Sequence, residues 1–99
     1  MSLPVVLRPE ARAEYDEAVD WFEQRRAGSG APFIRAVKQT LDLIGAQPKV
    51  HRAVLGDVRR APVSGFPYYR IIYRERDTDV EVLAVFHTSR DPAVWQGRA

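Results

Sequence analysis

The sequence lacks cysteine, and this absence excludes two kinds of site. Without thiols, the 99-residue chain has no disulfide bonds and no thiolate ligands for zinc. It also lacks an apolar run near the roughly 18 residues that cross a bilayer. The Met-Ser-Leu-Pro start has neither the basic nor the apolar region of a signal peptide. We therefore expect a cytoplasmic protein without membrane association.

Lysine is also scarce, because Lys38 and Lys49 are the only two among 15 basic residues and the other 13 are arginines. Residues 1–50 hold seven basic and seven acidic side chains. The net charge of +2 thus arises in residues 51–99, where eight arginines accompany six acids. Arginine makes planar, bidentate contacts to carboxylates and phosphates, which permits an anionic partner. A GC-rich genome produces the same bias, so composition alone requires no such partner.

The first half of the chain predicts a short edge strand at residues 3–7 and then two helices. Apolar residues recur at helical spacing over residues 10–26, starting just after Pro9, and over residues 31–46. The first apolar stripe consists of Ala11, Tyr15, Ala18, Val19 and Phe22, and the second of Phe33, Ile34, Val37, Leu41 and Ile44. The acids of the first helix are expected on its outer side; they are Glu10, Glu14, Asp16, Glu17, Asp20 and Glu23. The short link around Gly28 predicts an antiparallel helical hairpin over residues 9–47.

The second half predicts a β-meander over residues 58–87 and a tail over residues 88–99. Its three strands are expected at residues 58–63, 68–75 and 80–87, since short turns separate them. The last strand is apolar on both faces, which predicts a central position. Strict alternation places Val80, Val82, Ala84 and Phe86 on one of its faces and Leu83 and Val85 on the other. The result is one α+β domain, residues 1–99, in the order β-αα-βββ, with the hairpin packed on one face of an antiparallel sheet.

Arg70 is the first candidate for a functional residue, because it lies mid-strand on the face that alternation turns away from the hairpin, together with Arg74. A mid-strand arginine usually pairs with an acid or remains solvated. The functional alternative is contact with a phosphodiester backbone by several converging guanidinium groups. Arg59 and Arg60 project to opposite faces of the neighbouring strand, so only one of them can join Arg70.

His87 and Trp95 are the other candidates. His87 ends the last strand, where it can act as a general acid or base or can form a structural hydrogen bond. Neither His87 nor His51 has a second ligand at metal-binding spacing. The chain has no glycine-rich phosphate loop and no recognisable nucleophile, so we expect no metal and no cofactor. Trp95 is expected to attach the tail to the sheet, with stacking on a base as the alternative.

The chain resembles the RelE/ParE superfamily of type II toxin–antitoxin toxins over residues 5–98. The resemblance rests on the element order and on Gly56-Asp57-Val58-Arg59-Arg60, Phe66-Pro67-Tyr68, Tyr73-Arg74, Val82-Leu83-Ala84-Val85 and Arg90-Asp91-Pro92 with Trp95. It implies a toxin neutralised by a cognate ParD-like or RelB-like antitoxin, with operator DNA bound only through the antitoxin. The RelE branch cuts mRNA on the ribosome without a metal, whereas the ParE branch is associated with blocking DNA gyrase.

The resemblance also assigns roles residue by residue. Arg70 corresponds to an arginine that RelE proteins use on the scissile phosphate, and Arg59 lies near a position where they use lysine. Arg90 lies near a second functional arginine. His87 corresponds to a functional histidine of some RelE-like nucleases, and Trp95 stands where RelE has a catalytic tyrosine.

This chain departs from the RelE pattern at two points. Tryptophan has no acidic hydroxyl, and an always-protonated arginine is a poor substitute for the missing lysines in proton transfer. In a ribonuclease, Arg70, His87 and Arg90 would form the catalytic set. The candidate binding residues, whichever the activity, are Arg59, Arg60, Arg74 and Trp95. We expect instead a ParE-like protein that binds DNA gyrase. A RelE-like mRNA endoribonuclease and a non-toxic member that keeps only its antitoxin-binding fold are the alternatives.

Overall fold

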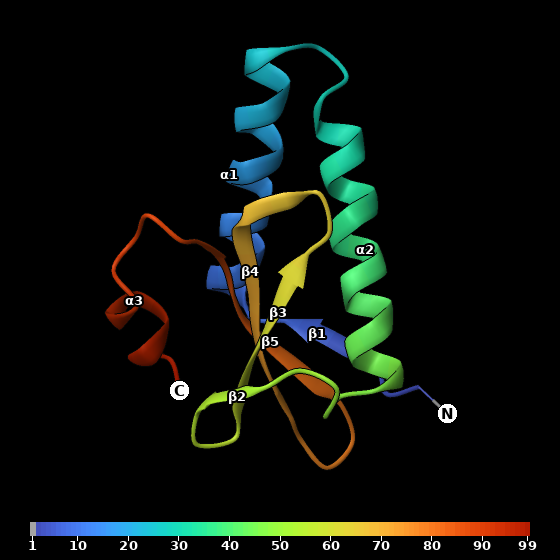
Figure 1. Ribbon diagram of the computed structural model, residues 1–99, viewed down its shortest axis with the longest axis vertical. Helices are drawn as coiled ribbons and strands as arrows, with labels where there is room; N and C mark the ends of the chain where they lie inside the picture. The colour runs from blue at the N-terminus through green and yellow to red at the C-terminus, as the bar shows by residue number, and fades with distance from the viewer. Residues whose placement is uncertain (1) are drawn as a thin grey trace.

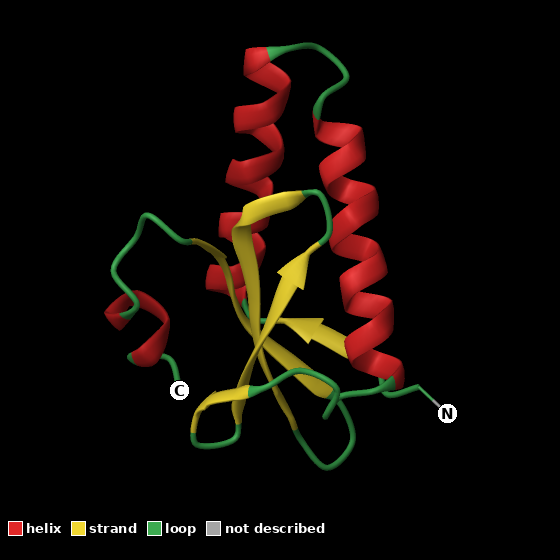
Figure 2. Ribbon diagram, in the orientation of Figure 1, coloured by secondary structure: helices red, strands yellow, loops and turns green. Residues whose placement is uncertain are grey.

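Two long helices and a five-stranded sheet form the body of the protein in a computed structural model that describes residues 2–99 (Figure 1). The elements are β1 (Val5–Leu7), α1 (Pro9–Arg25), α2 (Gly30–Ala46), β2 (Ala53–Leu55), β3 (Val58–Val63), β4 (Phe66–Glu75), β5 (Val80–His87) and α3 (Ala93–Gln96). This architecture confirms the predicted α+β class with a helical hairpin against a mostly antiparallel sheet (Figure 2). The short elements β2 and α3 were not predicted. No helix among the described residues has the length and apolar content to span a bilayer.

The link between α1 and α2 is shaped by glycines. Gly28 has φ +86°, a conformation that glycine adopts without steric cost, and it lies three residues after Arg25, the last residue of α1. The carboxylate of Glu23 accepts hydrogen bonds from the backbone N–H groups of Gly28 at 3.0 Å and Gly30 at 2.8 Å. These bonds satisfy donors at the start of α2 that have no partner within the helix. A Cβ atom on Gly30 would lie 2.9 Å from the Glu23 carboxylate, which would have to shift to make room for it.

The sheet has the strand order β1-β5-β4-β3-β2. Its four later strands pair antiparallel, whereas β1 runs parallel to β5, with Val5 opposite Val80. The predicted N-terminal edge strand is therefore confirmed. The prediction that the last strand is central is wrong, because the unpredicted β2 extends the far side of the sheet and β4 becomes the middle strand. β5 is nevertheless an interior strand, which explains its apolar character on both faces.

A bulge in β5 overturns the predicted alternation. Ile72 pairs with Ala84 but Tyr73 pairs with Val82, so Leu83 is an extra residue. Val80 and Val82 consequently share the helix-facing core with Val85, while Leu83, Ala84 and Phe86 pack on the other face. The prediction that groups Ala84 and Phe86 with Val80 and Val82 is therefore wrong.

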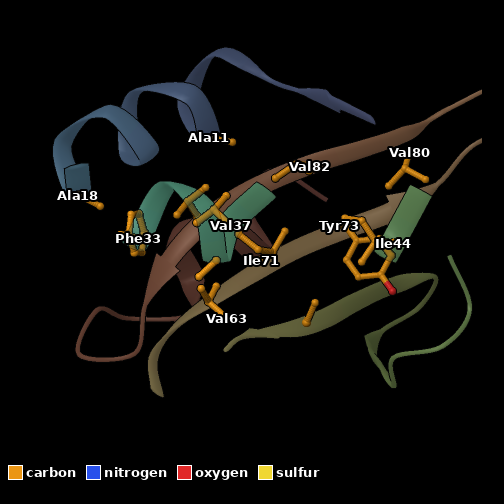
Figure 3. Packing of buried hydrophobic residues seen from close by; sticks show 13 residues of the cluster. Ala11, Ala18, Phe33, Val37, Ile44, Val63, Ile71, Tyr73, Val80 and Val82 are labelled. Atoms are coloured by element: carbon orange, nitrogen blue, oxygen red, sulfur yellow. The ribbon is translucent and has the colours of Figure 1, made fainter. Parts of the chain in front are cut away.

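Two apolar clusters lie on the two faces of the sheet. The larger one joins the hairpin to the sheet through Phe33, Val37, Ile44, Ile71 and Tyr73, which Figure 3 shows packed together. The smaller one lies on the opposite face and consists of Val58, Ile72, Leu83, Ala84, Phe86 and Trp95. The tail thus covers part of the face that alternation turns away from the hairpin. Ile34 is 40% exposed, contrary to its predicted place on the buried stripe of α2.

Candidate functional site

A groove of about 660 Å³ lies between α1 and the neighbouring ends of β4 and β5. Aromatic side chains supply much of its lining, namely Trp21, Phe22, Phe66, Tyr68 and Tyr69. Trp21 is 48% exposed and Tyr68 is 66% exposed. Large aromatic side chains left in contact with water in a concave surface are typical of a site that buries them against a partner. Burial raises the pKa of the Tyr69 hydroxyl above its ordinary value of 10.

His87 lies in the wall of this groove. Its Nδ1 atom accepts a hydrogen bond from the Ser89 backbone N–H at 3.1 Å, and the Ser89 hydroxyl lies 2.7 Å from the same atom. Since Nδ1 is an acceptor, the proton of the neutral ring resides on Nε2. The Tyr68 ring stacks on the imidazole at a centroid distance of 6.0 Å, and the Tyr69 ring meets it edge-on at 5.0 Å. These contacts hold His87 as part of the aromatic lining.

Glu14 contributes a buried carboxylate to the groove, so the expected position on the outer side of α1 is wrong for this residue. Its exposed fraction is only 9%. The carboxylate pairs with Arg98 at 2.9 and 3.1 Å and with Arg90 at 2.9 Å. Its spacing gives a signal that the prediction missed, because Glu14 lies three residues after Ala11 and four before Ala18, on the apolar stripe itself. We call Glu14, Arg90 and Arg98 the Glu14 cluster.

The Glu14 cluster completes the open edge of β5. β1 pairs with β5 only as far as Val82, so the edge beyond this residue has no neighbouring strand. There the carboxylate of Glu14 accepts a hydrogen bond from the Val85 N–H at 3.1 Å, and Arg98 donates to the Leu83 carbonyl at 3.0 Å. A side-chain ion pair thereby satisfies backbone groups that would otherwise lack partners. Arg98 was not a predicted functional residue.

Trp95 attaches the tail to the sheet, as the favoured interpretation of the sequence expects. Its side chain is 6% exposed and packs in the second cluster with Ile72 and Phe86. The alternative role, stacking on a base, would require Trp95 to leave this cluster.

The predicted arginines have different surroundings. Arg59 donates to the His51 carbonyl at 2.7 Å, and Arg74 lies 3.5 Å from the Asp57 carboxylate. Arg70 donates through Nη1 to the carbonyls of Pro67 at 2.6 Å and Tyr69 at 2.9 Å. Arg60 is exposed and has no ion-pair partner among residues 2–99.

The fold brings together only part of the predicted catalytic set. His87 and Arg90 both line the groove, whereas Arg70 does not. Arg70 is paired in register with Phe86 and His87 with Tyr69, so alternation directs the Arg70 and His87 side chains to opposite faces of the sheet. Among residues 2–99, no three potential metal ligands of the His, Asp and Glu types cluster together.

The comparison with protein families is decisive. The model of the ParE toxin of type II toxin–antitoxin systems (parDE) matches residues 5–92. The chain belongs to the ParE toxin family. This result confirms the resemblance to the RelE/ParE superfamily inferred from the sequence. Among curated proteins, the search finds no match.

Solved structures agree with this assignment at the level of fold. Ten chains match, among them one described as the chromosomal ParDE TA system from P. aeruginosa. The match has a TM-score of 0.74 and 11% identity, and it covers 87% of this chain and 96% of the other. At this identity the likeness concerns the fold alone. The ParE family places the chain among the toxins of type II toxin–antitoxin systems.

Proposed function

We propose that this ParE-family toxin inhibits growth by binding DNA gyrase in the cytoplasm and that a ParD-like antitoxin neutralises it. The family match over residues 5–92 carries the proposal. The geometry supports a binding protein rather than a nuclease, because alternation turns Arg70 and His87 to opposite faces and Arg90 is paired with Glu14. The RelE-like ribonuclease is therefore not favoured.

The purified toxin tests the mode of action directly. Added to DNA gyrase with relaxed plasmid and ATP, it is expected to inhibit supercoiling in proportion to its concentration. Added to programmed ribosomes, it is expected to leave the mRNA intact. Codon-positioned cuts with normal supercoiling would replace the gyrase proposal with the ribonuclease, and inactivity in both assays would favour the non-toxic alternative.

The aromatic groove is the surface that we assign to the antitoxin. Its exposed Trp21 and Tyr68 suit an apolar face of an amphipathic segment, because large aromatic anchors supply much of the binding energy of protein interfaces. Tyr68→Glu is expected to abolish co-purification with the protein encoded beside the toxin. Val50→Glu is the matched control, since Val50 is 51% exposed but lies outside the groove. Equal loss of the complex with both variants would contradict the assignment.

A further inference from the structure

Three arginines surround Ile72 on the face of the sheet that lies opposite the helical hairpin. Arg70 and Arg74 are the outward-facing residues on either side of Ile72 along β4. Arg60, on β3, is paired in register with Ile72 itself. Directly opposed residues on one face of a sheet lie about 5 Å apart between Cβ atoms. We call Arg60, Arg70 and Arg74 the arginine face.

Two members of the arginine face have no acidic partner among residues 2–99. Among residues 2–99, ion pairs engage five of the ten other arginines, in Arg8–Glu10, Arg12–Asp16, Arg76–Asp79, Arg90–Glu14 and Arg98–Glu14. Within the arginine face only Arg74 has such a contact, with Asp57. Arg60 and Arg70 form no ion pair within residues 2–99. Like charges on neighbouring strands disfavour the folded state, so stability gives no reason for this arrangement.

Hydrogen bonds to the backbone fix the Arg70 side chain in place before any ligand binds. Its Nη1 atom donates hydrogen bonds to two carbonyl oxygens, of Pro67 and Tyr69, which fixes the guanidinium group against the start of β4. The Nε and Nη2 atoms form no hydrogen bond within the described residues. A side chain that is already fixed loses less conformational entropy when it binds a ligand.

From these observations we propose that the arginine face binds an acidic segment of the target protein, with Arg60 and Arg70 pairing with its carboxylates. This inference rests on the proposed gyrase function and assigns the toxin surface that meets the target. Two guanidinium groups without an acidic partner, beside the exposed Pro62 that pairs in register with Arg70, suit a short acidic protein segment. Binding to a nucleic-acid backbone instead gains its affinity from neutralising many phosphates, and two arginines supply few such contacts.

The test measures the affinity of immobilised DNA gyrase for the wild-type toxin and for two double variants with equal charge changes. Arg60→Gln with Arg70→Gln removes the two free arginines of the face. Arg26→Gln with Arg35→Gln removes two exposed arginines elsewhere. We expect the first pair to weaken binding at least about tenfold and the second to change it less than about twofold. Arg60→Lys with Arg70→Lys, which keeps the charges, is expected to retain most of the affinity.

The outcomes separate this inference from the function on which it rests. Failure of the wild-type toxin to bind gyrase would overturn the gyrase proposal and this surface with it. Wild-type binding that both Gln pairs retain equally would overturn only the arginine face. A single-stranded RNA that binds the wild type but not the Arg60/Arg70 variant, and displaces gyrase, would reassign the face to nucleic acid. Co-purification with the antitoxin and unchanged urea unfolding serve as controls for folding.

Discussion

At the residue scale, Glu14 shows how one buried carboxylate fixes the C-terminal tail. It joins α1, the edge of β5 and two tail arginines, with four hydrogen-bonding contacts to groups far away in sequence. The sequence predicts the helix but not this role, because residue type alone does not distinguish which of the six acids on α1 faces inward. Only its position on the apolar stripe distinguishes Glu14. Its partners lie more than 70 residues away, beyond the reach of any local pattern.

Glu14→Gln is expected to lower the free energy of unfolding by about 2–3 kcal/mol. Breaking a buried ion pair costs about 3–5 kcal/mol, and the partial exposure of Arg90 reduces that cost here. Glu17 is an exposed acid on the same helix, and Glu17→Gln is expected to change the free energy of unfolding by less than about 0.5 kcal/mol. Urea unfolding of both variants makes the comparison. Similar losses for the two would mean that the Glu14 cluster contributes nothing specific.

His51 gives the stability a pH dependence of defined sign. Burial lowers the pKa of its imidazole below the ordinary value of 6.5, because desolvation disfavours the charged ring. The unfolded chain therefore takes up a proton before the folded chain does. The contribution of His51 is fully present above pH 6.5 and is lost as the pH falls through the lowered pKa of the folded state.

His51→Asn is accordingly expected to reduce the loss of stability between neutral pH and about pH 5. Urea unfolding at several pH values, for the variant and the wild type, measures the difference. Other groups that titrate in this range are present in both proteins and cancel. Identical pH profiles for the two proteins would contradict this role of His51.

At the element scale, the two long helices and the three long strands follow from local patterns, but β2 and the pairing of β1 do not. The apolar stripes of α1 and α2 and the alternation in β4 predict which faces are buried, since each face packs on the same sheet. The three-residue β2 and the parallel pairing of β1 depend on the strands beside them. The apolar run of β5 contains no sign of the extra residue Leu83. This residue moves Ala84 and Phe86 to the face opposite the one that strict alternation predicts.

The tail is expected to be an integral part of the second cluster. Trp95→Ala should lower the free energy of unfolding by about 3 kcal/mol, because it leaves a cavity where a buried indole packs on Ile72 and Phe86. Trp21 offers a matched control, since it is 48% exposed and its truncation should cost less than about 1 kcal/mol. Urea unfolding is followed by circular dichroism, because removing a tryptophan changes the fluorescence signal of the protein. Equal costs would contradict the packing role of Trp95.

At the scale of the whole molecule, the aromatic groove and the arginine face are two surfaces with different chemistry. The groove is mainly aromatic and lies beside α1, whereas the arginine face lies on β3 and β4. We assign the first to the antitoxin and the second to the target. Alternation along β4 predicts that Arg70 and Arg74 share one face of the sheet, whereas no local pattern predicts the groove, because its walls combine residues from α1, from the start of β4 and from the end of β5.

The measurement that tests the central proposal most directly is induction of the toxin in a sensitive bacterium with pulse-labelled thymidine and methionine. Incorporation of both labels is followed over the first minutes, with the empty vector as control. Inhibition of gyrase is expected to stop DNA synthesis first while translation continues. Translation that fails first, with DNA synthesis still intact, would contradict the gyrase-directed function.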